Sequence, residues 1–202
     1  MAERDGLADR AVTVALAAAL QESKLRNVAY GDLDSLGLFQ QRPSQGWGAP
    51  SQLLVPSYAA GAFYAALAKV PGWEALPIAD AAQAVQHSAA GDAYAQWEHQ
   101  AQVITDALSG VTPTAFSCRF VPAPSIAEAG GLAGAVNAEL GPSALGSPLS
   151  EARGWTVASW LIAHGPAYDI SSVTFMGQMW TAASGGWLPH LPALASVEVN
   201  GI

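Results

Sequence analysis

Residues 21–48 read QESKLRNVAYGDLDSLGLFQQRPSQGWG, and they end an apolar, alanine-rich segment. Apolar side chains recur at helical spacing over residues 7–23, which predicts a buried helix. Glu22 falls at its end, and the residues three, four and seven positions earlier are all alanine. Apolar surroundings and the negative end of a helix dipole both favour a protonated carboxyl. Glu22 is therefore a candidate general acid, but spacing alone favours the alternative, a solvated charge paired with Lys24 or Arg26.

A long loop is predicted after this helix. Gly, Pro, Ser and Asp are frequent between Asn27 and Pro56, and a loop of this length in a compact domain is usually functional. Trp47 stands between Gly46 and Gly48, where no regular element explains it as a core residue. We expect the Trp47 ring to contact a ligand, with anchoring of the loop as the alternative.

Two carboxylates in this loop, Asp32 and Asp34, invite a metal or catalytic interpretation. A calcium loop that begins at Asp32 is excluded, because its twelfth position is Pro43 instead of glutamate. A second catalytic carboxylate would suit an inverting hydrolase, which needs a base to activate water. We interpret both residues as turn and capping residues.

The rest of the chain predicts an α+β fold in two domains. Gly and Pro between residues 110 and 124 indicate a linker at 112–125, which would separate a domain at 1–111 from one at 126–202. The helical patterns lie at Ser57–Val70, Pro77–His87, Ala93–Leu108, Ile126–Leu140 and Glu151–His164. Alternating residues predict a hairpin about Gly177 and a third strand near Val197–Val199.

Two motifs of the opening stretch carry a resemblance to a known family. Glu22-Ser23 is followed by Gly37-Leu38-Phe39-Gln40, which resembles the Glu-Ser and Gly-Leu-Met-Gln motifs of the lysozyme-like lytic transglycosylases, with Phe in place of Met. Residues 21–27 and 35–48 together are similar to a secreted actinobacterial group of the superfamily that includes soluble lytic transglycosylases and goose-type lysozymes.

A third match lies later in the chain. Ala84-Val85-Gln86-His87-Ser88 followed by Ala93-Tyr94-Ala95 resembles the family's helix-loop-helix that brings a tyrosine and an amide near the catalytic glutamate. The asparagine usual in that segment is absent here. The resemblance covers about residues 7–108.

The resemblance implies an N-terminal, mainly α lysozyme-like domain followed by a small α+β accessory domain. It implies an enzyme that cleaves the β-1,4 bond between N-acetylmuramic acid and N-acetylglucosamine in peptidoglycan, with one glutamate as acid and then base, giving 1,6-anhydro products. The catalytic residue would be Glu22, and the substrate-binding residues Ser23, Gly37, Leu38, Phe39, Gln40, Trp47, Gln86 and Tyr94. The alternatives are a hydrolytic muramidase and a non-catalytic module that binds or scaffolds the cell wall.

The composition of the chain argues against several classes of binding partner and cofactor. The net charge of −8 argues against nucleic acid, because phosphate binding needs lysine and arginine. The longest apolar run, Ala11–Leu20, is too short to span a bilayer, so no membrane-spanning segment is expected. Four widely spaced histidines and a single cysteine, Cys118, form no metal motif, and we expect no metal or other cofactor.

The expected partner is the glycan strand of peptidoglycan, bound by a monomer. The resemblance implies a secreted or cell-surface protein. Glu3, Asp5 and Asp9 stand where an export signal would carry basic and apolar residues. We therefore expect a signal sequence to have been removed ahead of Met1.

Overall fold

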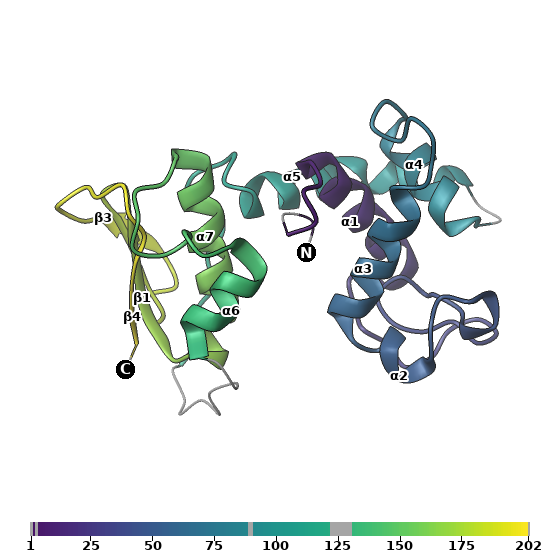
Figure 1. The fold of residues 1–202 in the computed structure, drawn as a ribbon, viewed down its shortest axis with the longest axis horizontal. Helices are drawn as coiled ribbons and strands as arrows, with labels where there is room; N and C mark the ends of the chain where they lie inside the picture. Colours follow the sequence, from purple (N-terminus) through teal and green to yellow (C-terminus); the bar gives the residue numbers. More distant parts are fainter. Residues whose placement is uncertain (1, 3, 89–90, 122–130, 202) are drawn as a thin grey trace. The chain divides into compact units, whose positions relative to one another are not determined.

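The computed structural model describes most of the chain, namely residues 2, 4–88, 91–121 and 131–201. It divides into two compact units, Met1–Thr105 and Asp106–Ile202 (Figure 1). The described elements of the first unit are helical, and the four strands lie in the second. The predicted α+β class is therefore confirmed. Within the described ranges, no helix is both long and apolar enough to cross a membrane.

The boundary between the units lies earlier than the sequence predicts. We expect a linker over residues 112–125, but the division falls within helix α5 (Glu98–Leu108). Packing explains the difference, because Phe116 and Phe120 of the expected linker lie against the buried core of the second unit. The end of that linker and the start of the predicted helix Ile126–Leu140 lie outside the described residues.

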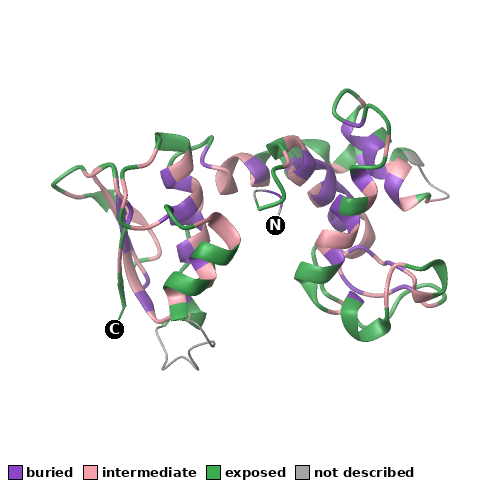
Figure 2. Ribbon diagram, in the orientation of Figure 1, coloured by how far each residue is buried: buried purple, intermediate pink, exposed green. Residues whose placement is uncertain are grey.

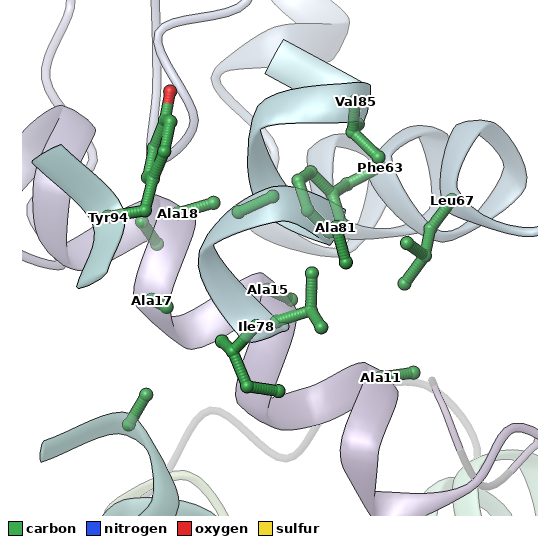
Figure 3. Close-up of a cluster of buried hydrophobic side chains, with 14 of the residues drawn as sticks. Ala11, Ala15, Ala17, Ala18, Phe63, Leu67, Ile78, Ala81, Val85 and Tyr94 are labelled. Atoms are coloured by element: carbon green, nitrogen blue, oxygen red, sulfur yellow. The ribbon is translucent and has the colours of Figure 1, made fainter. Parts of the chain in front are cut away.

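Helix α1 (Asp9–Ser23) is the centre of the first unit, and Figure 2 shows it mostly buried. The buried positions of α1 are mainly alanine, and small side chains allow α3 (Pro56–Leu67) and α4 (Ile78–Gln86) to approach closely. Figure 3 shows alanines of α1 lying among Phe63 and Val85 from these two helices. The buried helix predicted over residues 7–23 is confirmed, although it begins two residues later.

The long loop predicted between Asn27 and Pro56 contains little regular structure, as expected. Its short elements are the 3-10 helix η1 (Pro43–Gln45) and the single turn α2 (Pro50–Leu53). An isolated antiparallel bridge joins Leu36 to Gln41. The course of this loop is set mainly by individual hydrogen bonds and close packing.

The prediction of one α-helix over Ala93–Leu108 is wrong in its first turns. Residues Gly91–Trp97 form the 3-10 helix η2, and α5 follows it. A 3-10 helix has three residues per turn, so residues i and i+3 share a face. This geometry turns both Tyr94 and Trp97 toward the end of α1, where Trp97 Nε1 donates a hydrogen bond of 2.7 Å to Gln21 Oε1. Tyr94 and Trp97 thus join this tighter helix to the end of α1.

The second unit packs helix α7 (Glu151–His164) against an antiparallel sheet of order β3-β2-β1-β4 (Figure 1). The other elements are α6 (Gly131–Leu140), η3 (Gly165–Ala167), β1 (Ile170–Phe175), β2 (Gln178–Thr181), β3 (Trp187–Pro189) and β4 (Glu198–Gly201). The predicted helix α7, the hairpin β1–β2 and a strand near the end of the chain are confirmed. The sequence does not predict β3, which is a three-residue edge strand ending in proline.

Gly37 offers a test of how tightly the loop is packed. Both Gly37 (φ +76°) and Gly72 (φ +68°) are left-handed, but a Cβ would lie 2.3 Å from the Leu53 carbonyl oxygen at Gly37 and would meet nothing within 4 Å at Gly72. Each change to alanine introduces strain of about 1 kcal/mol, and Gly37→Ala also displaces backbone. We expect Gly37→Ala to lower the free energy of unfolding by roughly 1–3 kcal/mol more than Gly72→Ala does, as measured in urea titrations. Equal losses of unfolding free energy in Gly37→Ala and Gly72→Ala would show that the backbone around Gly37 moves aside without cost.

Candidate active site

Glu22 lies in the last turn of α1, is half-buried and lines a pocket of about 420 Å³. The pocket is formed by the end of α1, the long loop and the end of α4. The sequence predicts that a carboxyl at this helix end is sheltered but accessible. The structure gives Glu22 that environment.

Tyr94 holds the Glu22 carboxyl from the core side. Its side chain is buried (Figure 3), and its hydroxyl donates a hydrogen bond of 2.6 Å to Glu22 Oε1. Burial raises the pKa of Glu22 above 4.5, although the Tyr94 hydrogen bond and the charge of Lys24 partly oppose this. Burial and the contact with Glu22 also raise the pKa of Tyr94, so its hydroxyl remains a donor. The carboxyl is therefore fixed in orientation and retains its proton more readily than an exposed glutamate.

The alternative prediction, a solvated Glu22 paired with Lys24 or Arg26, does not match the structure. In the part of the chain that the structure describes, neither cation forms an ion pair with Glu22. The Lys24 ammonium lies 4.1 Å from the centre of the Trp97 ring, in a cation–π contact. Lys24 therefore influences the carboxyl from nearby without a direct bond.

Four of the predicted substrate-binding residues line the pocket together with Glu22: Phe39, Gln40, Trp47 and Gln86. Gln86 Nε2 donates a hydrogen bond of 2.8 Å to the Phe39 carbonyl oxygen, which joins the end of α4 to the loop. Phe39 itself is buried, and its ring stacks on Phe63 at 4.8 Å between centroids. The wall of the pocket is thereby tied to the core.

Gln40 and His87, which line the pocket, both have left-handed backbones, with φ of +47° and +50°. Such conformations are uncommon outside glycine and concentrate at functional sites. Gln40 Nε2 donates hydrogen bonds to the carbonyl oxygens of Gly37, at 3.2 Å, and Tyr30, at 3.3 Å. A Cβ at Gly31 would lie 1.9 Å from Gln40 Oε1, so glycine there leaves room for this amide.

The remaining predicted residues, Ser23, Gly37, Leu38 and Tyr94, do not line the pocket. Ser23 Oγ donates a hydrogen bond of 2.7 Å to the Leu38 carbonyl oxygen, and the Leu38 side chain packs on the core. Gly37 permits close contact with Leu53. These residues support the loop and the carboxyl, so we interpret them as positioning residues.

Several lining residues are not predicted as contacts: Asp32, Arg42, Gln45, His87 and Ser88. Asp32 matters most, because it adds a second carboxylate to the pocket of Glu22. The sequence shows acidic residues shortly before Gly37, which is the only signal that could have indicated this placement. The conformation of a loop decides which way such a side chain faces, and spacing alone does not.

Asp34 has the structural role that the sequence predicts. Its carboxylate accepts hydrogen bonds from Arg42 Nε (2.6 Å), the Ser44 backbone N–H (2.8 Å) and Ser44 Oγ (3.0 Å). The Arg42 bond, followed by those from Ser44, holds the pKa of Asp34 well below its usual range. Asp34 thus caps η1 and fixes Arg42 at the pocket.

The site is equipped for acid–base chemistry. Glu22 can donate and accept a proton, and Trp47, Gln40 and Gln86 line the same pocket. Among the described residues, no group of three His, Cys, Asp or Glu side chains is placed to hold a metal ion. No protein-family model matches the chain, and no curated protein matches its sequence.

The raised pKa of Glu22 predicts how stability depends on pH. The folded state holds this proton more tightly than the unfolded state, so stability falls as pH rises from about 4.5 through the folded pKa. Glu22→Gln removes this loss while keeping an acceptor for Tyr94. In thermal melts, the variant should gain stability over the parent on going from pH 4 to pH 7. Glu74→Gln, at an exposed position, controls for the loss of a charge. A gain in stability of Glu22→Gln that is the same at pH 4 and pH 7 would contradict the expectation.

Proposed function

We propose that this protein is a peptidoglycan lytic transglycosylase that cleaves the β-1,4 bond between N-acetylmuramic acid and N-acetylglucosamine. The observation that carries the proposal is the half-buried Glu22 carboxyl, held by Tyr94 at a pocket that Gln40 and Trp47 also line. Glycosidic cleavage needs such a sheltered carboxyl next to a space for sugar. The resemblance in the Glu22-Ser23 and Gly37 to Gly48 segments supplies the substrate class.

In the proposed reaction Glu22 acts twice. Its carboxyl gives a proton to the glycosidic oxygen, and the bond to the anomeric carbon of the muramic residue breaks. The resulting carboxylate then takes the proton of the muramic 6-hydroxyl, whose oxygen bonds to the anomeric carbon and closes a 1,6-anhydro ring. The raised pKa favours the first step. The hydrogen bond from Tyr94 holds the carboxylate in a fixed orientation for the second.

The surroundings of Glu22 fit a sugar ligand. Trp47 offers an aromatic surface for stacking, and the side-chain oxygens of Gln40 and Gln86 can accept hydrogen bonds from hydroxyl and acetamido groups while their amide nitrogens hold the loop. On this proposal the first unit is a lysozyme-like catalytic domain and the second a small accessory domain. The protein would act as a monomer, secreted or at the cell surface, where peptidoglycan is found.

Glu22→Gln tests the proposal directly. Loss of the general acid should lower the release of soluble muropeptides from purified sacculi by at least about 100-fold. Circular dichroism should show an unchanged fold, and mass spectrometry should find 1,6-anhydro ends in the products of the parent protein. Full activity of the variant would overturn the role of Glu22. Binding to sacculi without any product from the parent would indicate a non-catalytic wall-binding module.

A hydrolytic muramidase is the second candidate, favoured by the presence of Asp32 in the same pocket. A hydrolase needs a base for water, and Asp32 is the available carboxylate. In that case Asp32→Asn should lower turnover by about 100-fold, and the parent should yield reducing ends. A transglycosylase should keep forming 1,6-anhydro ends in Asp32→Asn. The type of product end therefore separates the two reactions even if both variants lose some activity.

A further inference from the structure

A second pocket adjoins the Glu22 pocket in the first unit. It has a volume of about 730 Å³ and lies between α3, α4 and the segment that carries Trp47. Gln45, Trp47 and His87 line both pockets, so the two spaces share a wall. The reaction proposed for Glu22 makes no use of this second space.

The lining of the second pocket is mostly small and apolar. Ala62, Ala65 and Ala66 from α3 face the space together with Ala84 from α4. Alanine lets helices pack closely where they meet, as it does around α1, but here it leaves an open volume instead. An open volume walled by methyl groups suits a ligand with small apolar side chains.

Lys69 gives the same pocket a positive charge. The side chain is exposed and lines the space, and none of the described lining residues is a carboxylate. Across the described residues, Lys69 has no ion-pair partner. An unpaired ammonium group in a protein of net charge −8 creates a local site for an anion.

We infer that this second pocket binds the acidic peptide carried by the glycan strand whose sugars occupy the Glu22 pocket, an inference that rests on the proposed function. In peptidoglycan the peptide is attached to the lactyl group of the muramic residue, next to the bond that is cleaved. It is short, contains alanyl methyl groups and bears free carboxylates. The alanine walls suit the methyl groups, and Lys69 suits a carboxylate. The two pockets share the wall of Trp47 and His87, so a peptide attached to a sugar in one pocket can reach the other.

The covalent link between sugar and peptide makes this contact effective. Once the sugar is bound, the peptide is held close to the second pocket, so even a modest attraction to Lys69 adds to the affinity. The pocket would thus distinguish glycan strands that carry peptides from strands that have lost them.

Binding to the Glu22→Gln protein tests the inference without turnover. Calorimetry compares two soluble fragments, a muramic acid–glucosamine disaccharide with its peptide and the same disaccharide without it. The peptide should tighten binding by about fivefold, the size expected for one exposed charge pair. Adding Lys69→Gln should remove this gain, and Lys69→Arg should keep it. Arg119→Gln, an exposed change in the second unit, controls for the loss of a positive charge.

Filling the pocket provides an independent variant. Ala65 is exposed, so Ala65→Phe should be tolerated by the fold while it occupies the space. Ala65→Phe should also abolish the increase in affinity that the peptide gives. It should leave binding of the bare disaccharide unchanged. Equal affinities for the two fragments, including no binding of either, would overturn the inference, as would a gain that survives both Lys69→Gln and Ala65→Phe.

Turnover by the otherwise unchanged protein separates this inference from the proposed function. On peptide-bearing strands, Lys69→Gln should lower kcat/KM by about fivefold, with no effect on strands stripped of peptide. An equal loss on both substrates would contradict a peptide pocket. If the parent cleaves neither substrate, the proposed function fails, and the binding comparison still decides whether the pocket takes the peptide.

Discussion

The burial of α1 on nearly every side is the constraint on which the first unit depends. Its alanines bring α3, α4 and η2 close together, so the helix runs through the core. A helix buried in this way can place charged side chains only near its ends. Ser23 and Glu22 lie in the last turn, where Ser23 binds the Leu38 carbonyl oxygen and Glu22 faces the pocket. The core, the course of the loop and the position of the carboxyl therefore follow from one helix.

Two opposed effects set the proton affinity of Glu22. Burial disfavours the carboxylate, whereas the Tyr94 hydroxyl and nearby Lys24 favour it. The positions of the Tyr94 hydroxyl and the Lys24 ammonium both depend on η2. Its three-residue turn presents Tyr94 to the carboxyl and Trp97 to the Lys24 ammonium. The backbone of η2 is thus linked to the chemistry of Glu22.

The sequence predicts those parts of the fold in which one buried face sets the spacing of apolar residues, as in α1 and α7. It also groups Glu22, Gln40 and Trp47, which line one pocket. It fails where a single contact decides the structure. Tyr94 lies beside Glu22, as the resemblance implies, but its side chain is buried and it stands on a 3-10 helix instead of the expected α-helix. Asp32 begins a turn as expected, since its carbonyl oxygen accepts a hydrogen bond from the Ser35 N–H, but its place in the lining of the pocket is not predicted, because spacing does not indicate which way a loop carboxylate faces.

One short segment shapes both pockets of the first unit. The Asp34 carboxylate binds Arg42 and the Ser44 N–H at the start of η1. A half-exposed ion pair of this kind adds little to stability, so its importance is geometric. Gln45 ends η1, Trp47 follows two residues later, and both line the two pockets. The partition between the pockets therefore depends on Asp34, although Asp34 lines neither of them. Asp34 thereby fixes an otherwise irregular loop at the wall between the two pockets. A ligand that spans both pockets would lie against this wall.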